Sequence, residues 1–324
     1  MSSRGASSIR AIDLTSKPLM SRRGFIARHI MRRVMVLDIG QRIPGVDSMA
    51  NEYEVGFGTV QEAVELISRA GAATFSRHGA QGTVLDSLDW CVAWTVAGLP
   101  NLIGTLPLPY TKRYEGLATA LHGLLAEAGT PTTLSYMRGA ARRLEAVADG
   151  HADFAVTSQF SAERFRDSTS DAVTTVVSLP AESFVREHGL VFAERNRQRV
   201  LPGDRMGVDR DSLDQMLLTE MEASDVEGEV ILVEMPYGHI LDGLVQGEID
   251  VAVWNPEEIS APGLSIQPLH SAAARELNGA DTQAAVVART DDELTRRALT
   301  LCLREDEVVA IQGDVISGKR QARY

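Results

Sequence analysis

The sequence predicts a small, mainly helical domain that ends in a β-hairpin, followed by a larger α/β domain with two lobes. In residues 19–86, apolar side chains recur at helical spacing and two short strand-like runs flank a glycine-rich tip. From Leu102 onward, short apolar strands alternate with helices, which is typical of largely parallel sheets. A length of 324 residues is enough for two domains with substantial cores.

Three helices and a hairpin are expected in the small domain. Ser21 is suited to cap a first helix over residues 22–37, and Asp47 a short second helix. A third helix is predicted over residues 57–70, and the segment AATFSRHGAQGTVLD (72–86) has the pattern of two strands joined by a turn. This order of elements is that of an α+β winged helix-turn-helix domain.

Two glycine-rich stretches resemble phosphate-binding loops but lack the surrounding structure. The segment EVGFGTVQEA (54–63) contains Gly56 and Gly58, but a polar helix precedes it and Gln61 occupies the position of the third glycine. The segment GDVISGKR (313–320) has arginine where Ser or Thr would bind magnesium, and too few residues follow to form a helix. We therefore expect no nucleotide cofactor.

Charge is unevenly distributed along the chain, whose net charge is −12. Residues 1–86 contain 11 Lys and Arg against 8 Asp and Glu, a balance of +3, whereas the remainder contains 21 against 36, a balance of −15. Five arginines cluster between Arg22 and Arg33. A basic end on an acidic body indicates a polyanionic partner for that end, although the cluster could also be the solvated face of a helix.

Other features indicate a cytoplasmic protein without a membrane segment. The two cysteines, Cys91 and Cys302, lie far apart and form neither a disulfide framework nor a metal-binding pattern. The first 20 residues lack the apolar core of an export signal. The most apolar run, residues 90–109, is interrupted by proline and glycine, so we expect a buried linker over 87–101 and then a strand.

The segment GQRIPGVDSMANEYEVGFGTVQEAVELISRAGAATFSRHGAQGTVL (40–85) resembles the DNA-binding domain of GntR-type repressors. The resemblance implies a recognition helix at GTVQEA and a wing at HGAQGT. The family usually has Ser-Arg where this chain has Gly56-Phe57, and often an arginine where it has Gln61, so DNA binding could be weaker or depend on other arginines. The residues expected to contact DNA are Arg22, Arg23, Arg42, Phe57, Gly58, Thr59, Gln61, Arg77, His78 and Gly79.

One supersecondary unit occurs twice in the larger domain. MRGAARRLEAVADGHADFAVTSQ (137–159) and PYGHILDGLVQGEIDVAVWN (236–255) both run from a turn through a helix to an apolar strand with a polar end. Two such lobes resemble the type II periplasmic-binding-protein fold, with lobe I at about 102–180 and 280–324 and lobe II at about 200–258. A closer resemblance, to the YhfZ family, covers nearly the whole chain through LPLPYTKRYEGLATAL, GDRMGVDRDSLDQ and VVAIQGDVISGK.

A ligand is expected between the lobes, because ligands of open α/β sheets bind beyond the carboxyl ends of the strands and near helix N-termini. Arg113 and Arg138 would suit a carboxylate or a phosphate. The residues expected to line the site follow the strands of both lobes. They are Tyr110, Thr111, Arg113, Tyr136, Arg138, Gly139, Ser158, Gln159, Asp209, Tyr237, Trp254 and Asn255.

The sequence thus favours a transcriptional regulator that binds a pseudopalindromic operator as a homodimer and responds to a small effector. Two alternatives stay open: an enzyme on the same fold, or a structural DNA-binding protein with a non-functional cleft. The seven histidines show no metal-ligand spacing and no G-x-S-x-G motif occurs, so no catalytic or metal-binding residue is assigned.

Overall fold

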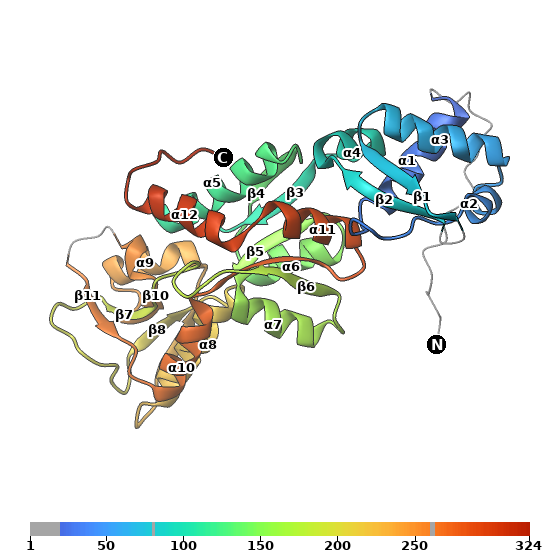
Figure 1. Ribbon diagram of the computed structural model, residues 1–324. Helices are drawn as coiled ribbons and strands as arrows, with labels where there is room; N and C mark the ends of the chain where they lie inside the picture. Colours follow the sequence, from blue (N-terminus) through green and yellow to red (C-terminus); the bar gives the residue numbers. More distant parts are fainter. Residues whose placement is uncertain (1–19, 80–81, 260–262) are drawn as a thin grey trace, which may run out of the picture. The chain divides into compact units, whose positions relative to one another are not determined.

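The computed structural model describes residues 20–79, 82–259 and 263–324. The chain divides into two compact units, Met1–Leu99 and Pro100–Tyr324 (Figure 1). Residues 1–18, whose polar and aperiodic sequence predicts a flexible N-terminal tail, lie outside the described residues.

The smaller unit contains the expected three helices and hairpin, followed by a fourth helix. Strands β1 and β2 pair antiparallel, and Arg42 forms an isolated bridge with Val84 of β2. Ile30, Met31, Ile67 and Leu85 are fully buried in its core. The elements are α1 (Arg22–Val34), α2 (Val46–Glu52), α3 (Phe57–Arg69), β1 (Ala73–Arg77), β2 (Thr83–Leu88) and α4 (Trp90–Ala97).

Two boundaries in the smaller unit differ from the sequence prediction. Ser21 does cap α1, because its hydroxyl accepts from the Gly24 N–H, but α2 is capped by Gly45 and not by Asp47. Asp47 lies in the first turn of α2, where its charge favours the helix dipole without capping. The interval 87–101, expected to be a linker, contains α4, whose side chains are apolar on nearly every side and show no helical period.

The larger unit contains two five-stranded sheets. In the first sheet, order β4-β3-β5-β12-β6, the strands β3, β4 and β5 are parallel and β12 is antiparallel to both neighbours. We call this sheet and its helices lobe I; α6 and α7 cover one face and α5 and α11 the other (Figure 1). Its elements are β3 (Leu102–Leu106), α5 (Lys112–Glu127), β4 (Thr132–Tyr136), α6 (Ala140–Ala148), β5 (Phe154–Ser158), α7 (Gln159–Ser168), β6 (Val173–Ser178), β12 (Ala284–Arg289), α11 (Glu293–Cys302) and α12 (Glu305–Ile316).

The second sheet repeats this arrangement in the order β11-β7-β10-β8-β9. Here β8, β9 and β10 are parallel, and β7 is antiparallel to β10 and β11. The repeated unit expected from the sequence is confirmed as β4-α6-β5 and β9-α9-β10. We call this part lobe II; its elements are β7 (Gly189–Phe192), β8 (Arg205–Val208), α8 (Leu213–Ser224), β9 (Ile231–Glu234), α9 (Tyr237–Gln246), β10 (Val251–Trp254), the 3-10 helix η2 (Pro256–Glu258), β11 (Ser265–Pro268) and α10 (Ala272–Asp281).

Lobe II extends beyond the interval 200–258 expected from the sequence, because β7 and β11 lie outside it. Both strands have only four residues, and β7 is buried along its whole length, so they give little periodic signal.

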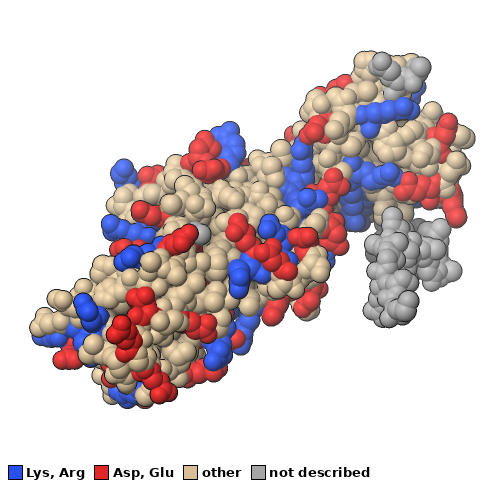
Figure 2. All heavy atoms as spheres, turned by 90° about the horizontal axis from the view of Figure 1, so that it is seen from below, with Lys and Arg blue, Asp and Glu red and all other residues tan. Residues whose placement is uncertain are grey.

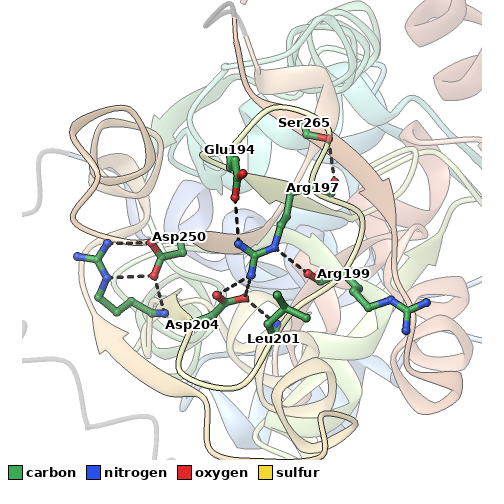
Figure 3. Close-up of polar contacts among 8 residues, drawn as sticks. Glu194, Arg197, Arg199, Leu201, Asp204, Asp250 and Ser265 are labelled. Carbon is green, nitrogen blue, oxygen red and sulfur yellow. Dashed lines mark hydrogen bonds and ion pairs between the residues drawn. The ribbon is translucent and has the colours of Figure 1, made fainter.

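An arginine network fixes the loop between β7 and β8 (Figure 3). Arg197 donates through Nη2 to both carboxylate oxygens of Asp204 at 2.7 Å, and through Nη1 to Glu194 at 3.3 Å. Arg205 forms a matching pair with Asp250 at 2.8 and 3.0 Å. Because Arg205 begins β8 and Asp250 precedes β10, this network lies at the amino ends of the parallel strands.

Close packing of β3 against β5 predicts a large difference between two glycine substitutions. A Cβ atom at Gly104 would lie 2.2 Å from the Phe154 ring, which is fully buried, whereas a Cβ at Gly123 of α5 would meet nothing within 4 Å. We expect Gly104→Ala to lower the free energy of unfolding by about 1–3 kcal/mol through overpacking. Gly123→Ala should raise it by about 0.5–1 kcal/mol, since alanine favours the helix. Urea unfolding of both variants measures this, and equal effects would contradict the packing argument.

Candidate functional site

The N-terminus of α3 is open and bears an exposed aromatic side chain. Gly56 is the N-cap and offers no side-chain hydrogen bond to the first turn, so the first N–H groups have no side-chain acceptor. Phe57 is 56% exposed, and a Cβ on Gly56 or Gly58 would meet nothing within 4 Å. Thr59 is half-buried and Gln61 is exposed on the same helix. This end of α3 is therefore accessible to a partner.

Most of the clustered arginines on α1 bond to groups inside the smaller unit. Arg28 and Arg32 donate to the carbonyl oxygens of Ala97 and Gly98 at 2.8–3.5 Å, which caps the C-terminus of α4. Arg33 pairs with Glu52, Arg22 donates to the Glu54 carbonyl at 2.8 Å, and Arg23 lies 3.6 Å from Glu62. Part of the charge cluster thus serves the fold, whereas Arg22 and Arg23 keep exposed side chains.

The remaining residues expected to contact DNA lie on the hairpin or, in the case of Arg42, beside it. The Arg42 guanidinium lies against Gly82, whose added Cβ would be 2.5 Å from Nε. His78 Nε2 is 2.9 Å from the Ser76 hydroxyl, and Gly79 has a φ of +52°. The exposed Arg77 ends β1 and has no acidic partner among the described residues. A groove between α3 and the hairpin is lined by Ile43, Val46, Gln61, Val64, Glu65, Ser68, Arg69, Phe75, Arg77 and Thr83.

A cleft in the larger unit lies at the carboxyl ends of the parallel strands and receives residues from both lobes. Of the residues expected to line it, Tyr110, Arg138, Gly139, Asp209 and Tyr237 do so. The complete lining is Pro107, Leu108, Tyr110, Tyr114, Met137, Arg138, Gly139, Ala140, Arg143, Phe184, Val185, His188, Asp209, Ser212, Asp214, Gln215, Tyr237 and Glu258.

The other expected residues lie outside the cleft wall, where each has a role in the fold. Thr111 caps α5, and Gln159 donates to Glu163. The Tyr136 ring meets the Tyr324 ring edge-on at 5.7 Å.

Two expected residues lie directly behind the wall. Trp254 is 3% exposed and stacks on Tyr237 with ring centroids 3.7 Å apart. Asn255 is buried; its oxygen accepts from the Glu257 N–H and its amide lies 3.4 Å from Glu258 Oε1. Asn255 therefore orients Glu258 and does not itself line the cleft.

Hydrogen bonds join the two lobes beside the cleft. The Ser158 hydroxyl donates to Asp214 Oδ2 at 2.9 Å, and the Ser161 hydroxyl donates to Asp214 Oδ1. Arg113 of α5 donates to both carboxylate oxygens of Glu257 at 3.0 and 3.1 Å. Ser158 and Arg113, which we expected to bind ligand, thus connect lobe I with lobe II.

Cationic groups line the lobe I side of the cleft. Arg143 is 4% exposed and donates to the Val156 and Met137 carbonyl oxygens at 3.0 and 2.9 Å. Burial lowers the pKa of Arg143 to about 10, so the guanidinium stays charged at neutral pH. Arg138 donates to the Tyr110 hydroxyl at 3.1 Å. Gly139 is the N-cap of α6 and offers no side-chain acceptor to the first N–H groups of the helix. These groups favour an anion.

Acidic groups line the lobe II side. Asp209 accepts from the Tyr237 and Asp211 N–H groups at 2.9 Å. Glu258 accepts from the Tyr237 hydroxyl at 3.2 Å. Burial raises the pKa of Glu258 to about 7, against the smaller opposing effect of its hydrogen bonds.

A buried titratable pair lies near the cleft. His188 Nδ1 is 3.2 Å from Asp281 Oδ2 and 3.0 Å from Asn278 Oδ1. Burial lowers the pKa of His188, while burial and the nearby Asp214 carboxylate raise the pKa of Asp281.

Sequence reasoning missed Arg143, Asp214 and Glu258. Arg143 had a detectable signal, since it falls on the buried face of α6 with Leu144 and Val147. Glu258 follows a turn whose geometry could not be read from the sequence.

Three further features of the described residues concern charge, hydropathy and possible metal ligands. Acidic and basic side chains are interspersed over the visible face of the larger unit (Figure 2). No helix in the described part of the chain is long and apolar enough to cross a membrane. No group of three or more His, Cys, Asp or Glu residues suited to a metal ion occurs within residues 20–79, 82–259 and 263–324.

The fold and the cleft define a class of proteins that join a helix-turn-helix domain to a two-lobed α/β domain. Residues 38–85 match a family described as a helix-turn-helix domain, and residues 89–324 match the YhfZ C-terminal domain. The chain therefore belongs to the YhfZ family.

Two YhfZ proteins agree with this assignment. The chain is 29% identical to the uncharacterized protein YhfZ of Escherichia coli strain K12 over 95% of this chain and 99% of that protein. The crystal structure of YhfZ from Shigella flexneri matches with 28% identity and a TM-score of 0.59, covering 73% of this chain and 98% of that chain. A periplasmic substrate-binding protein from Coxiella burnetii matches with 13% identity and a TM-score of 0.46, covering 67% and 97% of the two chains.

The raised pKa of Glu258 predicts a pH-dependent loss of stability. The folded protein keeps this proton up to about pH 7, whereas the unfolded chain releases it near 4.5, so folding binds a proton between these values. The free energy of unfolding should therefore fall as pH rises from about 4.5 to 7, by up to about 3 kcal/mol from this group. Urea unfolding at several pH values should show that Glu258→Gln lacks this contribution. Glu163→Gln, at an exposed position on α7, should keep it; identical pH profiles for the two variants would contradict the assignment.

Proposed function

We propose that this protein is a cytoplasmic transcriptional regulator that binds operator DNA as a homodimer and responds to a small polar or anionic effector held between lobes I and II. In this proposal the cleft binds the effector and does not catalyse a reaction. The observation that carries the proposal is the combination, in one chain, of a helix-turn-helix domain with a cleft that contains a buried, charged Arg143.

The proposed DNA-binding surface consists of α3 and the hairpin, which acts as a wing in the manner of GntR-type domains. Support comes from the accessible start of α3, where Phe57 and Gln61 are exposed, and from the groove that Gln61 shares with Arg77. Gln61 can pair with adenine in the major groove, and the first N–H groups of α3 can bind a phosphate. Arg77 would contact the phosphate backbone through the wing.

The proposed effector domain is of the periplasmic-binding-protein-like type II. Support comes from the identical strand order in the two lobes and from a cleft at the carboxyl ends of their parallel strands. An effector that contacts both lobes stabilises one lobe arrangement. If that arrangement alters how the dimer presents its α3 helices, effector and DNA affect each other's affinity reciprocally.

The first test separates phosphate binding by the hairpin from any effect of the larger unit. With a duplex selected from a random library, Arg77→Ala should weaken binding to all sequences about equally. It should also reduce the slope of log affinity against log salt by about 0.9 for each phosphate that Arg77 neutralises. Arg199→Ala, an exposed arginine of lobe II, should change neither quantity. Gel retardation over a salt series measures both; a salt-independent affinity of the wild-type protein would count against DNA binding through charge.

A second test addresses the oligomer. One α3 helix reads too few base pairs for useful specificity, so two copies are expected on a pseudopalindromic duplex. Light scattering should give about twice the 35.1 kDa chain mass for the free protein, and two chains per duplex in the complex. A single chain in both states would refute the dimer.

A further inference from the structure

The two walls of the cleft carry ionisable side chains of opposite type, and neither has an ion-pair partner among the described residues. Arg143 has no carboxylate within ion-pair distance among the described residues, and its two hydrogen bonds go to neutral carbonyl groups. Glu258 has no basic partner among those residues, and its neighbours are the Tyr237 hydroxyl and the Asn255 amide. Both side chains line the same cleft, one from each lobe, yet they do not pair with one another.

The other two carboxylates of the cleft wall accept hydrogen bonds from protein groups. Asp209 accepts two backbone N–H groups, and Asp214 accepts the hydroxyls of Ser158 and Ser161. Glu258 likewise accepts two hydrogen bonds, from the Tyr237 hydroxyl and the Asn255 amide, and its carboxyl group keeps further acceptor sites for a ligand. Arg138 and the uncapped start of α6 add to the positive side beside Arg143.

Arg143 and Glu258 line one and the same cleft, together with Tyr114, so a single ligand in the cleft can meet both side chains. Tyr114, Phe184 and Tyr237 form an aromatic part of its wall. The buried Arg143 guanidinium is costly without a counter-charge, and a ligand carboxylate would remove that cost. A ligand ammonium group beside Glu258 would favour the ionised form of that carboxyl group.

We propose that the effector is a small zwitterion of the amino-acid type, whose carboxylate binds Arg143 and the start of α6 and whose ammonium group binds Glu258. The inference rests on the proposed effector-binding function and specifies the ligand class of the same cleft. Because each charged group contacts a different lobe, the ligand joins the lobes. A simple carboxylate would leave Glu258 without its partner and should bind less tightly.

The twenty protein amino acids, added singly at millimolar concentration, serve as probes for calorimetry on the full-length protein. At least one should bind, and its des-amino analogue, the same carboxylic acid with hydrogen in place of the amine, should bind at least about tenfold less tightly. Glu258→Gln should bind the amino acid and the analogue about equally, with the analogue's affinity close to that for the wild-type protein. Glu163→Gln should behave as wild type.

Three outcomes would overturn the proposal: no amino acid binds the wild-type protein, the des-amino analogue binds it as tightly, or Glu258→Gln keeps the preference for the amine. Circular dichroism of each variant establishes that it is folded. Gel retardation on the same preparations measures DNA binding, so that a failure of the zwitterion proposal can be told apart from a failure of the proposed regulatory function. A protein that binds an amino acid but no DNA contradicts the regulator alone, whereas a protein that binds DNA but shows any of the three outcomes contradicts the zwitterion alone.

Discussion

The larger unit depends on a buried carboxylate that is shared between its lobes. Asp214 belongs to lobe II, but the hydroxyls that satisfy it come from Ser158 and Ser161 of lobe I. If the lobes separated, Asp214 would exchange these hydrogen bonds for water, and Ser158 could still cap α7 through the Ser161 N–H. Exchanges of this kind have a small net free energy, so the closed and open arrangements can lie close together. A cleft that responds to a ligand needs such a balance.

The two ends of the parallel strands in lobe II differ in whether their charged side chains form ion pairs. At the amino ends of β8 and β10, Arg197 and Arg205 each face a matching carboxylate, and the network holds the preceding loop (Figure 3). At the carboxyl ends, Glu258 has no such partner among the residues that the structure describes. The net charge of −12 therefore says little about the ligand, because the arrangement of charges and not their sum defines the site.

Periodicity predicted the helices and strands whose buried faces alternate with polar ones, including α3, α6 and the repeated β-α-β unit. It failed for α4 and β7, which are apolar on nearly all sides and give no period. The topological rule that places ligands at the carboxyl ends of parallel strands located the cleft, but it could not say which side chains turn inward. Ser158, Arg113 and Asn255 follow strands as expected and yet bond to protein groups, whereas Arg143 enters the wall from one turn inside a helix.

Tryptophan placement has a practical consequence for the study of the cleft. Trp254 is the only tryptophan of the larger unit, since the other two, Trp90 and Trp94, belong to the smaller one. Its indole stacks on Tyr237, whose ring forms part of the cleft wall. A molecule that enters the cleft and shifts Tyr237 therefore alters the surroundings of a natural fluorophore. The protein carries its own optical reporter of occupancy, readable as a change in emission above the constant signal of the other two indoles, without any attached label.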